Sequence, residues 1–315
     1  KEIIAAIEMD AKGFSGIDIE ATVQRRYPFG DLAAQILGYI SEVDPGDIKR
    51  HPKKRLQPGD YVGKIGLERI YDAELRGEYG IGYVEVDSMG RRRKTEGGEK
   101  LLGFVSQTEP VPGNNLFLTI DVDLEIVARA ALKARKLSGA VVAIDPRSGE
   151  ILAMVSEPSF DPGRISGREI ESMVWKDVSA DPNKPLLNRA MQGIYPPGST
   201  FKLFMAIAGL SEKLIHEKTT FFCSGSMFFG NRKFSCWKRH GIADFMKSIR
   251  ESCDVYYYNV GNKLGIDIIA RYARFFGLGQ KTELGKLSDA RFPEALGFPE
   301  QVGLIPDSEW KLRTF

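Results

Sequence analysis

The chain has 315 residues, of which 43% are hydrophobic and 27% are charged, and its formal net charge is +2. This composition is typical of a globular protein large enough for two domains. It argues against a nucleic-acid-binding protein, which usually carries a strong basic excess on one face. The densest basic run, at residues 91–94, is short and is followed by two glutamates, so we expect a solvated surface there.

The sequence shows neither a membrane span nor a signal peptide. No stretch reaches the roughly 18–20 apolar residues that a spanning helix needs. Residues 1–7 instead follow an amphipathic helical pattern. We therefore expect any segment that exports or anchors the protein to lie upstream of residue 1.

The pattern along the chain predicts two domains of the α+β class. Residues 1–112 form an irregular mixed region with one short alternating strand at 83–87, and a turn cluster at 111–115 marks the predicted boundary between domains 1–112 and 113–315. Beyond it the sequence predicts a strand at 116–120, a helix at 122–135 and a β-hairpin at 139–155. Alternating βαβ units are not evident, which favours antiparallel strands over a doubly wound nucleotide-binding sheet.

Residues 196–202 read Pro-Pro-Gly-Ser-Thr-Phe-Lys and precede an apolar run that predicts a helix. Ser199 then lies at the helix start, where a serine is commonly an N-cap. Lys202 follows three positions later on the same face, so its amine can reach the Ser199 hydroxyl. A serine is a weak nucleophile until a neighbouring base activates it. Both interpretations, an N-cap and a nucleophile with its base, are open on this segment alone.

Residues 185–190 and 195–202 together resemble the active-site entry of class B penicillin-binding proteins. The resemblance extends to residues 145–162, which are similar to the first hairpin of that family and its exit. Residues 26–28, 38–39 and 63–77 resemble the pedestal of the penicillin-binding protein 2 branch. The resemblance implies an antiparallel transpeptidase domain with helices, preceded by a mixed α/β pedestal.

The resemblance also implies a mechanism for named residues. Ser199, activated by Lys202, would attack the D-Ala-D-Ala carbonyl of a peptidoglycan stem peptide, and a neighbouring stem peptide would resolve the acyl-enzyme. β-Lactam antibiotics would acylate the same serine. Residues 252–254 read Ser-Cys-Asp and match the second family motif. Ser252 would relay protons and Asp254 would orient substrate and hold the lysine network, unless the segment is only a polar cluster beside a helix.

The third family motif, Lys-Thr-Gly or Lys-Ser-Gly, does not occur in the 315 residues. The resemblance implies that the rest of the catalytic domain, with this motif, follows residue 315. Two other functions stay open: a hydrolase of the same fold, such as a D,D-carboxypeptidase or β-lactamase, and a non-catalytic scaffold of the cell-wall machinery.

All three cysteines and one of the three histidines lie within 31 residues, as Cys223, Cys236, His240 and Cys253. Three thiolates and an imidazole make a complete ligand set for a structural zinc ion. The alternatives are a disulfide with one spare thiol, or three inert buried cysteines. The resemblance favours zinc, because similar proteins often place metal ligands near the matching Cys-Trp-Lys-Arg segment.

Location and partners follow from the resemblance alone. It implies a protein of the bacterial periplasm, anchored to the inner membrane by an N-terminal helix outside this chain. The implied partners are stem peptides, β-lactams, a membrane glycosyltransferase and a periplasmic scaffold of the elongation machinery.

Overall fold

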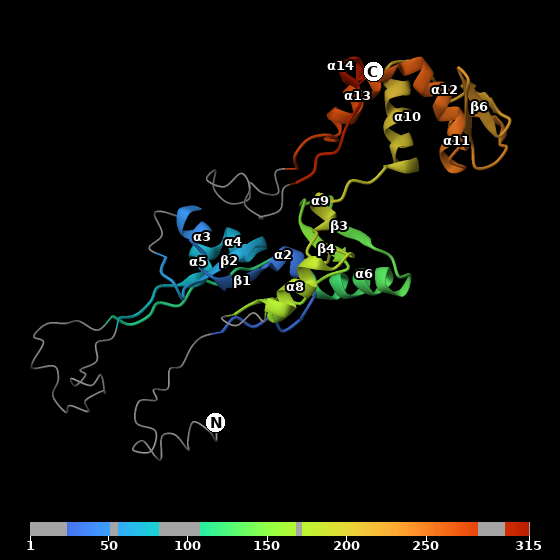
Figure 1. Ribbon diagram of the computed structural model, residues 1–315. Coiled ribbons are helices and arrows are strands. Elements are labelled where there is room, and N and C mark those ends of the chain that lie inside the picture. Colours follow the sequence, from blue (N-terminus) through green and yellow to red (C-terminus); the bar gives the residue numbers. More distant parts are fainter. Residues whose placement is uncertain (1–23, 51–55, 82–107, 168–171, 283–299, 315) are drawn as a thin grey trace, which may run out of the picture. The chain divides into compact units, whose positions relative to one another are not determined.

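The computed structural model describes residues 24–50, 56–81, 108–167, 172–282 and 300–314 (Figure 1). The predicted features at residues 1–7, 83–87 and 91–94 lie outside these ranges. The described residues form two compact units: unit 1 lies within Lys1–Ala190, and unit 2 comprises residues of Met191–Ala290 and Pro299–Phe315. The domain boundary at residues 112 and 113 stays a prediction.

Unit 1 begins with short helices around a two-stranded antiparallel sheet, in which Tyr39 pairs with Ile65 and Glu42 pairs with Tyr61. Gly38 permits a close approach at the sheet's end, because a Cβ there would lie 1.8 Å from the Ile65 carbonyl oxygen. The elements are α2 (Ala34–Leu37), β1 (Tyr39–Glu42), α3 (Pro45–Arg50), β2 (Tyr61–Ile65), α4 (Gly66–Ile70) and α5 (Asp72–Arg76).

The predicted helix and hairpin are confirmed. Helix α6 (Val122–Ala134) begins at Asp121, whose carboxylate accepts the N–H groups of Asp123 and Leu124 as an N-cap. It packs against β4 (Ile151–Glu157), which pairs antiparallel with β3 (Gly139–Ile144). The remaining helices that start in unit 1 are α7 (Pro162–Ile165), α8 (Ser172–Ala180) and α9 (Arg189–Gln192).

The predicted strand at residues 116–120 is wrong. A strand needs a ladder of backbone hydrogen bonds to a neighbour, and the described residues offer only two anchors here. The Thr119 hydroxyl donates to the Ile151 carbonyl at 2.6 Å, and the Asp121 N–H donates to the Leu152 carbonyl at 2.8 Å. Phe117 is 92% exposed. The segment therefore runs past the start of β4 without joining the sheet.

Buried ionic groups hold unit 1 together. Arg129 of α6 donates to both carboxylate oxygens of Asp31, and its Nε donates to Glu157 of β4 at 3.0 Å. Glu125, also on α6 and 1% exposed, accepts the Met154 N–H at 2.6 Å. These contacts fix the position of α6 on β4 and attach the loop that carries Asp31.

Unit 2 is built around helices α10, α12 and α13, and its two small sheets pair β5 with β8 and β6 with β7, both antiparallel. Its core includes Met205 of α10 and Tyr256 and Val260 of α12. The elements are a 3-10 turn (Gly198–Thr200), α10 (Phe201–Ser211), β5 (Phe221–Cys223), β6 (Ser226–Phe229), β7 (Arg232–Ser235), β8 (Gly241–Ala243), α11 (Phe245–Arg250), α12 (Asp254–Leu264), α13 (Ile266–Phe275) and α14 (Ser308–Thr314).

Among the described residues, all the strand pairs that form the sheets are antiparallel, including β1 and β2, which helix α3 connects. This arrangement confirms the α+β class. Within the same ranges, none of the helices has the length and hydropathy that a bilayer crossing requires.

Four helices of the two units end in the same backbone motif. In each, two N–H groups beyond the helix bond back to carbonyls of its last turn, and the residue after the cap has a left-handed φ. Glycine fills this position after α13, as Gly277. The other three positions, after α6, α10 and α11, hold Lys136, Lys213 and Ser252, with φ values of 53°, 58° and 51°. A side chain disfavours this conformation by about 1–2 kcal/mol.

Candidate active site

Ser199 lies in the 3-10 turn that leads into α10. Pro197 precedes the turn, and Gly198 has a φ of 58°, a conformation that glycine adopts without strain. The Ser199 side chain caps neither the turn nor α10. Its Oγ is instead 2.8 Å from the Ser252 Oγ, and the residue is exposed. The hydroxyl is therefore presented outward and bonded to another hydroxyl.

Lys202 lies in the first turn of α10 and is directed toward the end of α11. Its Nζ donates to the Oγ and the carbonyl oxygen of Ser252, both at 2.8 Å. The same Nζ is 2.6 Å from a carboxylate oxygen of Asp254, the first residue of α12. The Lys202 side chain is 14% exposed and that of Asp254 is 27% exposed. The ammonium is thus held by three oxygens in a partly desolvated position.

The structure brings all four predicted catalytic residues into one hydrogen-bonded group. It differs from the simplest expectation in one respect: among the described residues, no direct hydrogen bond joins Lys202 to Ser199. The connection instead runs from Lys202 Nζ to Ser252 Oγ and on to Ser199 Oγ. The Ser252 hydroxyl therefore lies between the amine and the candidate nucleophile.

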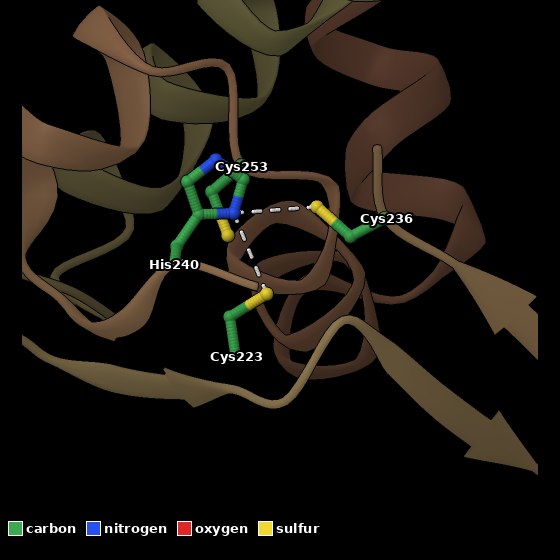
Figure 2. Close-up of side chains that lie close together, drawn as sticks. All are labelled: Cys223, Cys236, His240 and Cys253. Atoms are coloured by element: carbon green, nitrogen blue, oxygen red, sulfur yellow. Dashed lines mark hydrogen bonds between the residues drawn. The ribbon is translucent and has the colours of Figure 1, made fainter. Parts of the chain in front are cut away.

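The predicted metal ligands also converge (Figure 2). One ligand atom from each of Cys223, Cys236, His240 and Cys253 lies within 4.8 Å of the others. The Sγ atoms of Cys223 and Cys236 are each 3.5 Å from His240 Nδ1. All three cysteines are free thiols, so the disulfide interpretation has no support in the geometry. The group joins the end of β5, the β7–β8 loop and the start of α12.

The surroundings of this group fit a cation. His240 Nε2 is 3.1 Å from the Glu251 carbonyl oxygen, so Nε2 carries the proton and Nδ1 faces the sulfurs with its lone pair. The Asp254 N–H donates to Cys236 Sγ at 3.3 Å. Burial raises the pKa of the Cys253 thiol to about 12. Burial opposes ionisation of Cys223 too, but hydrogen bonds with His240 lower its pKa to about 7. Three sulfurs and one nitrogen form a ligand set typical of zinc.

Two residues beside the site were missed by the sequence analysis. The carbonyl oxygen of Glu251 accepts hydrogen bonds from Trp237 Nε1 at 3.0 Å and from His240 Nε2 at 3.1 Å. A backbone acceptor leaves no residue-type signal, so Glu251 could not be found in this way. The only available signal for Trp237 was its place between two candidate metal ligands.

Comparisons with known proteins identify the family to which the chain is similar. A family model described as the penicillin binding protein transpeptidase domain matches residues 139–290, and one described as the penicillin-binding protein dimerisation domain matches residues 1–118. The peptidoglycan D,D-transpeptidase MrdA of Acinetobacter baumannii is 37% identical over 96% of this chain and 42% of its own length. The chain spans about half the length of the curated relatives it matches.

Solved structures show the same likeness. In the complex of penicillin-binding protein 2 with MreC from Helicobacter pylori, one chain matches with a TM-score of 0.78 and 28% identity, over 99% of this chain and 55% of that one. A peptidoglycan synthase complex that coordinates polymerization and crosslinking gives a TM-score of 0.76 and 31% identity, over 99% and 53%. The chain belongs to the class B penicillin-binding proteins of the penicillin-binding protein 2 type.

Proposed function

We propose that the protein is a peptidoglycan D,D-transpeptidase that crosslinks stem peptides through an acyl-enzyme at Ser199. The observation that carries this proposal is the hydrogen-bonded chain from Lys202 Nζ through Ser252 Oγ to the exposed Ser199 Oγ. Such a chain supplies the base that a serine nucleophile needs. The similar MrdA protein of A. baumannii is named for the same activity.

In the acylation step, Ser199 Oγ attacks the carbonyl carbon of the D-Ala-D-Ala bond. The Ser199 proton passes to Ser252 Oγ while the Ser252 proton passes to the amine form of Lys202. Asp254, 2.6 Å from Nζ, stabilises the ammonium that results. The positive N-terminal end of α10 favours the negative charge of the oxyanion in the tetrahedral intermediate.

Collapse of this intermediate breaks the peptide bond, and the terminal D-Ala leaves as an amine that takes its proton back through Ser252. The amine of a neighbouring stem peptide then attacks the ester carbonyl. Its proton travels through the same chain, and Ser199 leaves with its hydroxyl restored. A β-lactam opens in the first step, but its amine stays attached to the acyl group, so the adduct persists.

The test is the intact mass of the full-length protein after incubation with a penicillin. We expect one stable adduct on the wild type, none on Ser199→Ala, and an unchanged adduct on Ser211→Ala, an exposed serine at the end of α10. Absence of an adduct on the wild type would contradict the proposal and favour a non-catalytic scaffold. Rapid release of hydrolysed penicillin would favour a hydrolase.

We further propose that Cys223, Cys236, His240 and Cys253 hold a structural zinc ion. Four protein ligands leave no open position for water, so the ion, when bound, stabilises the fold and takes no part in the reaction. We expect about one zinc per chain by elemental analysis. Replacement of Cys223 by Ser should lower both the zinc content and the melting temperature. Wild-type protein that retains no zinc after growth in zinc-supplemented medium would contradict this proposal.

The location and the macromolecular partners are also proposals. We infer that the protein acts in the periplasm, anchored to the inner membrane, with a membrane glycosyltransferase and a periplasmic scaffold. The similar H. pylori protein is solved in complex with MreC, and another similar chain belongs to a peptidoglycan synthase complex. Protease added to spheroplasts should digest the full-length protein, and co-purification should recover both partners. Protection from the protease would contradict the proposed location.

A further inference from the structure

We propose that Trp237 is a positioning residue for the proton relay: its indole N–H fixes the peptide group between Glu251 and Ser252, and this directs the Ser252 hydroxyl toward Ser199. The inference rests on the proposed transpeptidase function. It concerns a residue that makes no hydrogen bond to Ser199 or Lys202 in the part of the chain that the structure describes, and that is not one of the four predicted metal ligands.

The direction of the Ser252 hydroxyl depends on the two peptide groups that flank it. In the first, the Ser252 N–H donates to the Ile249 carbonyl at 3.2 Å, and the Glu251 carbonyl accepts from Trp237 Nε1 at 3.0 Å and from His240 Nε2 at 3.1 Å. In the second, the Ser252 carbonyl accepts from Lys202 Nζ at 2.8 Å, and the Cys253 N–H donates to the Ser248 carbonyl at 3.0 Å. All four polar groups of these two peptides are therefore bonded, which fixes both backbone angles of Ser252.

The other helix ends show that this arrangement is particular to α11. Helices α6 and α10 end in the same motif, with Lys136 and Lys213 in the left-handed position. Among the described residues, no side chain donates to the carbonyl of the preceding residue in either case, Arg135 or Glu212. Only the α11 end adds ring N–H donors to the shared motif. These two donors, from Trp237 and His240, hold the peptide group that precedes Ser252, and Ser252 bonds to the nucleophile Ser199.

Core packing does not explain Trp237, because 63% of its surface is exposed. The contacts of the ring instead keep the indole N–H on its acceptor. The Lys238 Nζ lies 4.7 Å from the ring centroid and 3.0 Å from the Glu251 carboxylate. The His240 ring meets the indole edge to face, with centroids 5.5 Å apart. Trp237 and Lys238 thus hold the backbone and the side chain of Glu251 together.

The two ring donors to Glu251 differ in what else they do. His240 faces the sulfurs with its other nitrogen, so a change at His240 affects the metal group and the Glu251 carbonyl together. Trp237 is not one of the four predicted metal ligands, although its ring packs edge to face on His240. A substitution that removes the indole N–H and keeps an aromatic ring therefore tests the position of the relay with the least change to the metal group.

The experiment compares Trp237→Phe with the wild type of the full-length protein, by the rate of penicillin acylation at Ser199, zinc content and melting temperature. Loss of one positioning hydrogen bond should slow acylation about 2- to 12-fold, in the rate constant and not in the affinity for penicillin. Zinc content should not change. The matched control is Tyr258→Phe, which removes an aromatic donor to the Ser235 carbonyl in the same unit and should leave acylation unchanged.

A double-mutant cycle separates positioning from other roles. If Trp237 acts through the Ser252 hydroxyl, Trp237→Phe should have no further effect in a Ser252→Ala background. Three results would overturn the inference. Trp237→Phe could acylate at the wild-type rate, it could slow acylation equally in both backgrounds, or it could lose zinc. If Trp237→Phe proves unstable, benzothienylalanine at position 237 keeps the ring shape without the N–H and answers the same question. Absence of a Ser199 adduct on the wild type would instead contradict the proposed function.

Discussion

Arg129 in unit 1 and Lys202 in unit 2 are both largely buried cations held by acceptors that lie far apart in the sequence. Arg129 is 9% exposed and bonds the carboxylates of Asp31 and Glu157. Lys202 is 14% exposed and bonds the carboxylate of Asp254 and two oxygens of Ser252. The two cations are therefore buried to a similar extent, but Arg129 is paired with two carboxylates and Lys202 with one.

The difference lies in where each network ends. Both partners of Arg129 are carboxylates, which accept hydrogen bonds but pass no proton on. One partner of Lys202 is a hydroxyl, which bonds in turn to the exposed Ser199 hydroxyl. A buried cation is therefore a sign of chemistry here only because its hydrogen-bond chain continues to a group at the surface.

The most severe test of this comparison is Lys202→Ala. If Lys202 is the base of the relay, the rate of acylation at Ser199 should fall about 10²- to 10⁴-fold. The loss of stability should be smaller than for Arg129→Met, because one carboxylate loses an ion pair instead of two. Stopped-flow measurement with a chromogenic β-lactam on the full-length protein gives this rate. The control is Lys263→Ala, an exposed lysine of α12. Acylation within twofold of the wild type would remove Lys202 from the mechanism.

Arg129→Met should have the opposite result. It removes the buried cation of Glu157 and leaves Asp31 with Lys133, whose Nζ is 3.8 Å away. Breaking a buried ion pair such as Arg129–Glu157 costs about 3–5 kcal/mol of unfolding free energy. Denaturant titration measures this loss. The matched control is Arg147→Met, whose ion pair with Asp145 has an 88% exposed arginine side chain and should contribute much less, because solvent screens an exposed pair. Equal losses from the two variants would show that Arg129 is not a structural tie.

Ser252→Gly separates the structural role of Ser252, as the left-handed residue after α11, from its role in the proton relay. Glycine adopts the left-handed conformation without strain, so the variant should be about 1 kcal/mol more stable than Ser252→Ala, while both lack the relay hydroxyl. Lys213→Gly makes the same change at the end of α10 and should gain similar stability with normal acylation. Thermal unfolding and the acylation rate check both statements. Normal acylation by Ser252→Gly would contradict the relay.

The smallest expected effect is a pH dependence from Glu125. Burial raises the pKa of this carboxyl above its usual value of 4.5. The folded protein thus holds the proton of Glu125 more tightly than the unfolded chain does. The free energy of unfolding therefore falls as the pH rises from 4.5 through the pKa that this carboxyl has in the folded protein. Glu125→Gln keeps an oxygen to accept the Met154 N–H and removes this fall. Urea titrations between pH 4 and pH 8 should therefore show a flatter stability curve for the variant.

The sequence was sufficient where local pattern decides structure. The helical spacing of apolar residues predicted α6, and Pro-Pro-Gly before Ser199 predicted where α10 starts. The predicted strand at residues 116–120 was wrong. Its residue pattern suits a strand, but a strand also needs a neighbouring strand with which to pair, and only the assembled fold decides whether one is present. The convergence of the four ligand side chains was predictable only from their residue types, since nothing in the spacing fixes their distances.

The path of the relay could not be predicted from spacing either. Three-residue spacing places Lys202 on the face of Ser199, yet its amine bonds to Ser252, fifty positions away. That choice depends on how α11 ends, and specifically on a left-handed serine held by backbone bonds and by two rings. These contacts use carbonyl oxygens, which every residue has.

The helix stop shared by α6, α10 and α11 has a practical consequence for engineering. Glycine at Lys136, Lys213 or Ser252 should raise thermal stability by the same mechanism. A library ranked by heat resistance alone would therefore enrich all three replacements together, including the one that removes the relay hydroxyl. Selection of stabilised variants for inhibitor screening thus needs a penicillin-labelling step in every round, because the melting temperature does not distinguish a functional protein from an inert one.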